Sequence, residues 1–248
     1  MGDGMKGTSM IYALCAVLIT AAAFAVTMRH DADAARYLEL AKMKELAPGL
    51  VVTRPFAPIP GCGVLIHQHY VLTAGHVGSV EGPADMPVQY GDKQYTVDHV
   101  SLFPEFKKRK ENWGGYDVAI LRLKGEGITG VAPAVLWTGG IAAGRAFIGV
   151  GQGKSGTGKE TDEPLKAGTF RGYENSIDYI FGGGDYNLMA ADFDSPEGNA
   201  DTLADTLFYP VKKKITGTPS PQALPLEGSL AAGDSGSGIW GSFKGKYY

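Results

Sequence analysis

Three short segments, each with one polar residue among small or apolar neighbours, constrain this chain more than any other feature. They supply His76, Asp117 and Ser235, in that order. An imidazole within hydrogen-bond reach can take the proton of a serine hydroxyl, and a carboxylate behind the imidazole fixes its tautomer and stabilises its charged form. The sequence therefore predicts an activated serine nucleophile. The segments are Leu-Thr-Ala-Gly-His-Val at 72–77, Tyr-Asp-Val-Ala-Ile-Leu at 116–121 and Gly-Asp-Ser-Gly-Ser-Gly at 233–238.

The order of the three residues separates families of serine hydrolases. Subtilisins run Asp, His, Ser and α/β-hydrolases run Ser, Asp, His, whereas chymotrypsin-like enzymes run His, Asp, Ser. Over residues 58–245 the chain resembles the trypsin/chymotrypsin-like serine proteases. The resemblance rests on the strand-like segment 61–66 leading to the histidine, on the segment around Asp117 and on the Gly-Asp-Ser-Gly loop.

This resemblance implies a fold, an activity and roles for individual residues. The fold is all-β, with two antiparallel β-barrels of the six-stranded chymotrypsin type. The activity is that of a serine endopeptidase working through an acyl-enzyme, with Ser235 as nucleophile, His76 as base and then acid, and Asp117 orienting His76. The amides of Gly233 and Ser235 would form the oxyanion hole, because glycines at such a loop let backbone N–H groups approach a ligand.

Ser229 is the residue that the resemblance places at the base of the pocket for the substrate side chain before the cut. It lies six positions before the nucleophile and offers a neutral hydroxyl, which predicts a preference for uncharged, apolar or aromatic residues. Glu227 stands two residues earlier. A register slip of two would put a carboxylate at the base and favour Arg or Lys.

The chain departs from the family at two places. The family continues well beyond the equivalent of Tyr248, so we expect the second barrel to be incomplete and this chain, as a fragment, to be poorly active. In many members a new amino terminus of the Ile-Val-Gly-Gly type pairs with the aspartate before the nucleophile, here Asp234. No such sequence precedes His76, and residues 50–53 are a poor substitute. Asp234 therefore has another partner, or activation follows another route.

The N-terminal segment 1–27 is expected to direct export. Met10 to Thr27 is uncharged, and Ala23-Phe24-Ala25 is a small-x-small site that signal peptidase could cut. The run is also near the lower length limit of a membrane-spanning helix. A cleaved signal peptide is favoured over an uncleaved anchor. The protein is then secreted or periplasmic, or is anchored through residues 10–27 with the protease domain outside the cytoplasm.

Residues 28–50 precede the domain and contain a helical pattern at 32–47, which fits a pro-segment, a spacer or a strut against the first barrel. The protease domain is predicted at 51–248, with barrel one over about 51–135 and barrel two over about 140–248. The expected strands are 63–66, 69–74, 87–90, 93–100, 117–123 and, opening the second barrel, 146–151. A charged surface loop is expected at 103–110.

Other features exclude function classes rather than suggest them. The net charge is −3 with no basic stripe, which argues against nucleic acid. The segment 153–160 nearly spells a phosphate-binding loop but has Glu160 where Ser or Thr would hold Mg²⁺, so nucleotide binding is not favoured. The acidic stretch 185–205 is interpreted as a solvated loop rather than a calcium site. We expect no cofactor and no metal.

Cys62 is the only cysteine outside the N-terminal segment, so the exported domain has no intrachain disulfide. Many animal members bridge this position to the residue after the histidine, here Val77; the cysteine-poor pattern looks bacterial. We expect a monomer acting on a protein or peptide. Three alternatives stay open: a non-catalytic binding protein on a protease fold, an inactive fragment, and, more weakly, an esterase.

Overall fold

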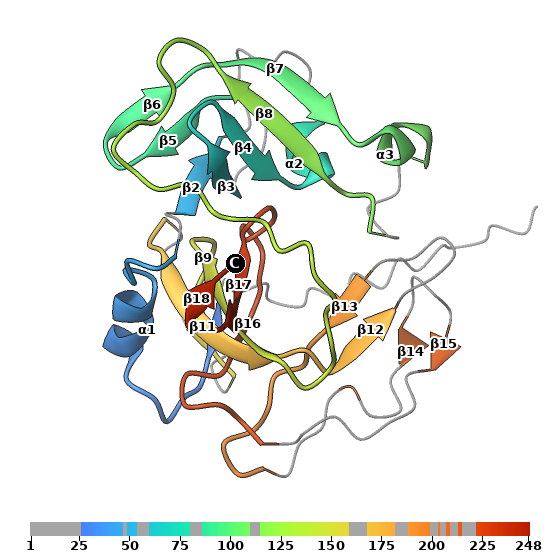
Figure 1. Cartoon of the computed structure of the whole chain (residues 1–248). Coiled ribbons are helices and arrows are strands. Elements are labelled where there is room, and N and C mark those ends of the chain that lie inside the picture. Colours follow the sequence, from blue (N-terminus) through green and yellow to red (C-terminus); the bar gives the residue numbers. More distant parts are fainter. Residues whose placement is uncertain are drawn as a thin grey trace, which may run out of the picture.

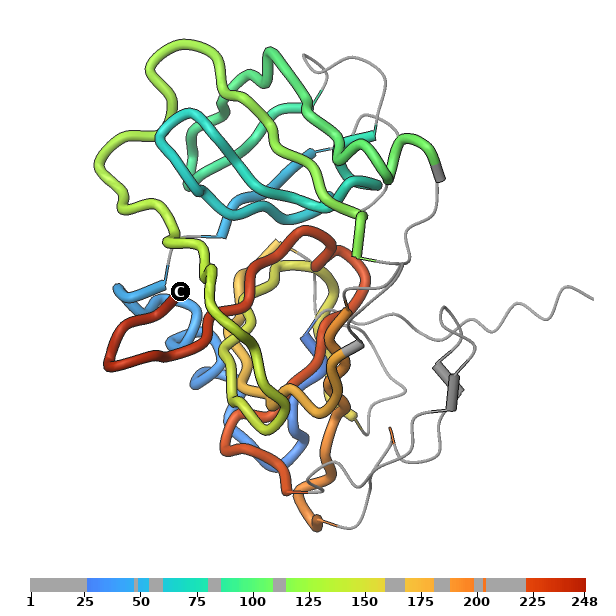
Figure 2. Tube along the Cα trace, turned by 45° about the vertical axis from the view of Figure 1, so that its right-hand side comes forward, coloured from blue at the N-terminus to red at the C-terminus, as the bar shows by residue number. Residues whose placement is uncertain are grey.

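The computed structural model describes residues 26–46, 49–53, 60–79, 86–109, 115–158, 168–181, 188–198, 203, 207–208, 213–214 and 222–248. Within these ranges the chain forms short β-strands in two modules, one above the other in Figure 1. Figure 2 shows the same two modules from another side, with the segment between β8 (Ala119–Leu123) and β9 (Ala146–Gly151) passing from one to the other.

The first module is a seven-stranded sheet that curves into a nearly closed barrel. Its strand order is β6-β5-β2-β3-β4-β8-β7, so β6 and β7 are the two ends of the sheet. Only Thr96 separates these strands in the chain, so one bent segment supplies both ends of the sheet. The remaining bounds are β2 Gly49–Val52, β3 Gly61–His67, β4 Tyr70–Thr73, β5 Val88–Tyr90, β6 Lys93–Tyr95 and β7 Val97–Leu102.

Alternation of apolar and polar residues explains why these strands form a barrel. In β8, Ala119, Leu121 and Leu123 are buried, whereas Ile120 and Arg122 between them are exposed. Successive strand side chains point to opposite faces, so one face fills the barrel interior. The interior cluster consists of Leu50, Val52, Leu65, Val71, Val77, Met86, Val88, Val97, Leu121, Leu123 and Ile128.

The second module combines two sheets. One has the order β11-β9-β17-β18 and the other has the order β10-β1-β16, and a bridge between Glu174 and Glu227 links them. Two hairpins, β12–β13 and β14–β15, complete the described strands. The bounds are β1 Thr27–Met28, β10 Gly156–Thr157, β11 Arg171–Ser176, β12 Tyr179–Phe181, β13 Leu188–Ala190, β14 Leu207–Phe208, β15 Lys213–Lys214, β16 Gly228–Ser229, β17 Ile239–Phe243 and β18 Lys246–Tyr247. The predicted all-β fold of two barrel modules is confirmed.

The helix near the N-terminus is shorter than expected and lies against the other module. α1 spans Ala34–Leu40 rather than 32–47, and the Asp33 carboxylate accepts a hydrogen bond from Ala35 N as its N-cap. The chain after Leu40 continues as turns that bury Leu46. α1 packs against β11 of the second module rather than against the first barrel. The expected hydrophobic helix at 10–25 lies outside the described residues.

Two other expectations for loops are wrong. The segment expected as a charged loop forms α3 (Pro104–Arg109), because Phe106 is buried and fixes one face of the turn. Asp192 and Asp194 are buried rather than solvated. The backbone carbonyl of Asp192 accepts a hydrogen bond from the side-chain amide of Asn175. The remaining helix, α2 (Gly75–Gly78), follows β4. Of the described helices, none has the length and hydropathy needed to cross a membrane.

Tyr37 of α1 provides a test of how the N-terminal segment contributes to stability. Its side chain is fully buried, and its hydroxyl donates to Glu227 O at 2.9 Å and accepts from Arg29 N at 3.0 Å. We expect Tyr37→Phe to lower the free energy of unfolding by about 1–2 kcal/mol, because one buried and one partly buried backbone group lose their partner. Denaturant unfolding measures this. Tyr70→Phe, at an exposed tyrosine of the first barrel, should stay within about 0.5 kcal/mol of the parent; equal losses in both variants would contradict the assigned role.

Candidate active site

His76 is the second residue of the one-turn helix α2, which Ala74 joins to the end of β4. A side chain at Gly75 would place its Cβ 2.9 Å from Asp117 Oδ1 and 3.1 Å from the Phe106 ring. Only glycine leaves room for the carboxylate to approach the backbone here, so the small residues before His76 are required by the site. The Phe106 ring of α3 packs against this turn.

His76 and Asp117 are joined by two hydrogen bonds. The ring Nδ1 of His76 lies 2.7 Å from Asp117 Oδ2, and the backbone N–H of His76 donates to Asp117 Oδ1 at 2.6 Å. A proton on Nδ1 leaves the lone pair on Nε2, which is the tautomer a general base needs. Both side chains are partly exposed, at 28% for His76 and 19% for Asp117, so the ring can reach a substrate. The structure thus brings two of the three predicted residues together.

The loop that carries Ser235 lies against the first barrel. Ser235 O accepts a hydrogen bond from Cys62 N at 2.7 Å, and the free, buried Cys62 donates from Sγ to Gly233 O at 3.3 Å. A Cβ on Gly236 would stand 2.3 Å from Thr73 Oγ1. The loop therefore contacts β3 and the end of β4, just before the turn of His76. No hydrogen bond joins the Ser235 hydroxyl to the His76 ring.

The glycines of this loop adopt conformations that other residues avoid. Gly233 has φ 101° and Gly236 has φ 86°. The backbone amides of Gly233 and Ser235 donate to no acceptor among the described residues. Two unused amides beside a serine are what an oxyanion hole requires.

Asp234 is the buried centre of the loop and accepts hydrogen bonds from three backbone amides, two of them far away in the sequence. Its Oδ2 accepts from Val26 N and Ala231 N, each at 3.1 Å, and its Oδ1 accepts from Gly153 N at 2.9 Å. Burial raises the pKa of Asp234, while these amides oppose the rise. The segment that resembled a phosphate-binding loop thus donates an amide to a carboxylate of the protein.

Gly151 and Val26 also surround the Asp234 carboxylate, and the sequence analysis identified neither of them. A Cβ on Gly151 would lie 2.1 Å from Asp234 Oδ1, so β9 must end in glycine for the carboxylate to enter. Val26 lies in the apolar N-terminal run, where it is indistinguishable from its neighbours by hydropathy. A glycine directly after an apolar strand was the only local signal for a close approach.

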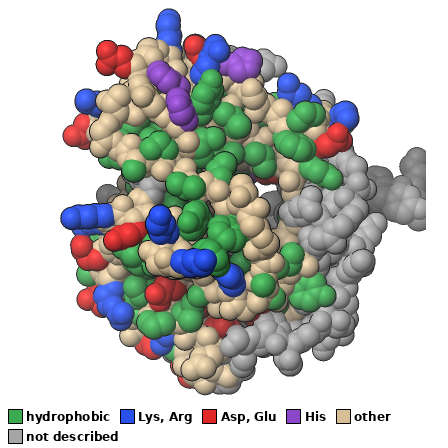
Figure 3. Space-filling view, viewed as in Figure 1, with side chains coloured by type: hydrophobic (Ala, Val, Ile, Leu, Met, Phe, Trp, Pro, Cys, Tyr) green, Lys and Arg blue, Asp and Glu red, His purple; other side chains and the backbone are tan. Residues whose placement is uncertain are grey.

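A cavity of about 420 Å³ is lined by Asp117 of the pair and by Gly236 of the loop that carries Ser235. Hydrophobic side chains gather in the middle of the face shown in Figure 3, where the two modules meet. The residues around the cavity that bear on the site are Asp117, Trp137, Gly236, Trp240 and Tyr248. Among the residues that the structure describes, no cluster of His, Cys, Asp or Glu could hold a metal ion.

Ser229, the predicted pocket residue, lies in β16 and pairs with Thr27 of β1. Glu227 precedes it and is buried, with Oε2 accepting from Leu224 N at 2.8 Å. Burial raises the pKa of Glu227 to about 8, and the nearby carboxylates of Asp194, Asp178 and Asp192 add to the rise. Glu227 is therefore uncharged at neutral pH.

The pKa of Glu227 predicts a pH dependence of stability. An unfolded glutamate loses its proton near pH 4.3, whereas folded Glu227 keeps it to about pH 8, so the folded state binds more protons between these values. The free energy of unfolding should fall as pH rises through this window. Glu227→Gln cannot ionise and should remove that part of the fall, being more stable than the parent at pH 9. Chemical denaturation across pH measures both, with Glu126→Gln at an exposed glutamate as control; parallel profiles would contradict the prediction.

Comparison with known proteins gives one family. A family model described as Trypsin matches residues 59–198. Among solved structures the chain is similar to kallikrein-related peptidase 10 in complex with Zn²⁺, at 16% identity and a TM-score of 0.40, over 56% of this chain and 60% of that one. It is also similar to mouse neuropsin, a serine protease expressed in the limbic system of the brain, at 17% identity and a TM-score of 0.48, over 78% and 81%. No curated protein matches the sequence.

Proposed function

The chain belongs to the trypsin family, and we propose that it is an exported serine endopeptidase that uses Ser235, His76 and Asp117. The observation that carries the proposal is the pair of hydrogen bonds between His76 and Asp117. They favour the tautomer with the proton on Nδ1, which leaves Nε2 free to act as a base. The loop of Ser235 contacts the chain directly before His76.

The mechanism follows from the chemistry of these groups. His76 Nε2 takes the proton of the Ser235 hydroxyl as Ser235 Oγ attacks the scissile carbonyl. The amides of Gly233 and Ser235 stabilise the oxyanion of the tetrahedral intermediate. His76 then gives its proton to the leaving amine, which leaves an acyl-enzyme on Ser235. Water, deprotonated by His76, releases the second product.

The Ser235 hydroxyl must come within reach of His76 for this to happen. Catalytic hydrogen bonds in free enzymes are often long and tighten only in the substrate complex. The absence of this hydrogen bond is also the observation that favours the alternative, a non-catalytic binding protein on the same fold. Substitution of the triad distinguishes the two functions.

In a full-length active enzyme, we expect Ser235→Ala to lower peptide hydrolysis by about 10⁶-fold and Asp117→Asn by about 10⁴-fold, because the three groups act as a unit and Asn favours the wrong tautomer. Hydrolysis of a casein substrate and labelling by a serine-directed fluorophosphonate provide the measurement. Ser237→Ala, two positions along the same loop, is the matched control and should keep most of the activity. Hydrolysis that survives Ser235→Ala would exclude this site.

We also propose export to the periplasm or the medium, directed by the N-terminal segment 1–27, with retention as a membrane anchor as the alternative. Fractionation with mass measurement separates the two outcomes. The proposed substrate is a protein or peptide and the proposed state is a monomer.

The proposed specificity is for uncharged, apolar or aromatic residues before the cut. Ser229 supplies a neutral hydroxyl, and two features keep Glu227 from acting as a pocket carboxylate: its Oε2 is occupied by Leu224 N, and its raised pKa leaves it neutral. A cationic side chain would therefore find no counter-charge there.

A peptide library should show this preference for the parent enzyme. Ser229→Asp should shift the dominant cleavage to Arg and Lys, because it adds a carboxylate at the pocket base. Leu230→Asp, at the exposed neighbouring position, should leave the preference unchanged. Dominant cleavage after Arg or Lys by the parent enzyme would mean that the Ser229 register is mistaken.

A further inference from the structure

A second cavity, which the proposed mechanism does not use, lies in the second module. Strands β9 and β17 and the segment that joins the two modules line it, together with Ile177 and Met189. Its volume is about 130 Å³. An apolar cavity of about 150 Å³ can bind a benzene molecule. The second cavity therefore has room for a group close to the size of one aromatic ring.

The wall of the second cavity is apolar except at one position. Its aromatic part consists of Trp137, Phe243 and Tyr248, and the centre of the Trp137 ring lies 5.1 Å from that of Phe243 and 5.3 Å from that of Tyr248. Among the described residues around the cavity, Arg145 is the only charged one. Sites for small ligands combine a mostly apolar wall with a few polar groups that fix the orientation of the ligand. The second cavity has this composition.

The positive charge at the second cavity has no counter-charge. The side chain of Arg145 is exposed and forms no ion pair with any residue that the structure describes. Its Cζ lies 5.8 Å from the centre of the Phe243 ring, and Nζ of Lys244 lies 5.3 Å from the same centre. Two cations thus lie beside one ring of the cavity wall. A ligand with a negative charge is favoured at this place.

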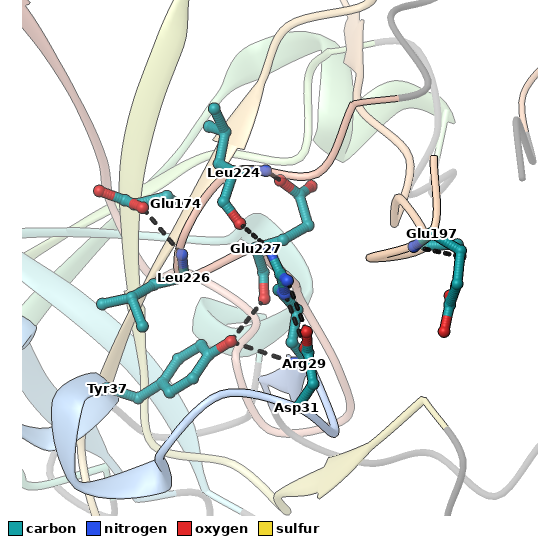
Figure 4. Close-up of polar contacts among 9 residues, drawn as sticks. Arg29, Asp31, Tyr37, Glu174, Glu197, Leu224, Leu226 and Glu227 are labelled. Atoms are coloured by element: carbon teal, nitrogen blue, oxygen red, sulfur yellow. Dashed lines mark hydrogen bonds and ion pairs between the residues drawn. The ribbon is translucent and has the colours of Figure 1, made fainter. Parts of the chain in front are cut away.

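Arg29, another arginine of the second module, shows what a partnered guanidinium looks like here. It donates to the carboxylate of Asp31 and, at 2.8 Å, to the carbonyl of Leu224 (Figure 4). Its donors are therefore used within the chain. The guanidinium of Arg145 has no such carboxylate among the described residues, so its donors are available to a ligand.

A carboxylate that carries one large apolar group matches both features of the second cavity. The apolar group fills the cavity and is removed from water. The carboxylate accepts charge-assisted hydrogen bonds from the guanidinium of Arg145, whose planar fork fits two carboxylate oxygens. A cationic ligand is repelled by the same group, and an uncharged one leaves it unused.

The proposed reaction makes a compound of this kind. Water adds to the acyl carbon of the acyl-enzyme, the ester bond to Ser235 breaks, the serine oxygen regains a proton, and the residue before the cut becomes a carboxylate. Under the proposed specificity that residue is apolar or aromatic. Its nitrogen stays in an uncharged peptide bond. The amino-terminal product therefore ends in a large apolar side chain next to one negative charge.

The second cavity adjoins the cavity of the candidate active site. Trp137, Ile239 and Tyr248 line both this cavity and the one that contains Asp117. A product that leaves Ser235 thus has a second apolar surface directly beside the first. Its proximity is the reason for choosing the product, rather than an unrelated carboxylate, as the ligand.

We propose that the second cavity is a product site, which binds the C-terminal residue of the released amino-terminal fragment with the side chain inside and the carboxylate on Arg145. The proposal rests on the proposed protease function and adds a site that retains one of its products. A free carboxylate with the same ring shares this chemistry, and the choice of probes distinguishes the two sources.

The first experiment is a calorimetric titration with N-acetyl-phenylalanine, which mimics the end of the product. Removal of the charge in N-acetyl-phenylalaninamide, or of the ring in N-acetyl-alanine, should each lower the affinity by about tenfold or more, because each removes one of the two interactions. Equal affinities of the acid and its amide would overturn the proposal. 3-Phenylpropanoate, a free carboxylate without the peptide group, should bind no more tightly than N-acetyl-phenylalanine. Binding of 3-phenylpropanoate alone would refute the assignment to the product.

The second experiment tests the position of the site. Arg145→Met should lower the affinity for N-acetyl-phenylalanine by about tenfold or more, whereas Lys93→Met, which removes an exposed charge of the first barrel, should leave it unchanged. Both variants should melt at the temperature of the parent, because neither side chain is buried. In a methionine-methyl NMR spectrum the probe should shift the signal of Met189, which lines the cavity, and not that of Met86 in the first barrel. An unshifted Met189 signal, or an unchanged affinity of Arg145→Met, would overturn the inference.

Casein hydrolysis by the full-length enzyme, measured in parallel, separates this inference from the proposed function. Hydrolysis together with binding that does not depend on Arg145 would overturn the product site and leave the protease function intact. Binding that depends on Arg145 in a protein that hydrolyses no casein and takes up no fluorophosphonate would support the carboxylate site and refute the protease function.

Discussion

The buried carboxylate of Asp234 is the constraint on which the rest of the second module depends. It binds amides from three segments that are far apart in the chain: Val26 at the N-terminal end, Gly153 after β9 and Ala231 in its own loop. β9 ends in glycine because a side chain at 151 would collide with this carboxylate. The strand β1, the Gly-rich loop after β9 and the nucleophile loop are thus arranged around one side chain. The first barrel supplies His76 and Asp117, and the second positions Ser235 through Asp234.

The sequence predicted the parts of the fold that have a local signature. The apolar run at 146–151 is β9 with the bounds expected, and the alternation at 117–123 became β8. The small residues before His76 and the glycines around Ser235 were likewise readable, because each meets a requirement for close approach or for positive φ. His76 and Asp117 could be paired only through the family resemblance, since nothing local at either residue names the other. Ser235 stays a prediction as a member of the triad, because its hydroxyl makes no hydrogen bond to His76.

What the sequence could not show depends on tertiary contacts. Val26 lies in an apolar run in which every residue suits a leader, so hydropathy hides its role as a partner of Asp234. The segment that contains Phe106 is basic in composition but forms α3, because the Phe106 ring is buried. Asp192 is buried because it accepts hydrogen bonds from Asn175 and Leu203, which its acidic neighbours do not suggest. The helix at 34–40 ended early because packing on β11 and the burial of Leu46 required the chain to turn. In each case burial overrode local composition.

The position of β1 between β10 and β16 has a consequence for how the protein is assembled. The strands and the interior cluster of the first barrel all come from residues 49–128, so the barrel can form as soon as that part of the chain has emerged. The second module forms later. Its strand nearest the N-terminus is synthesised first but finds its partner β16 only when the chain has reached Ser229. Contacts so distant in sequence form slowly, because a long loop must close before they stabilise anything. The second module, together with the loop that carries Ser235, is therefore assembled after the first barrel.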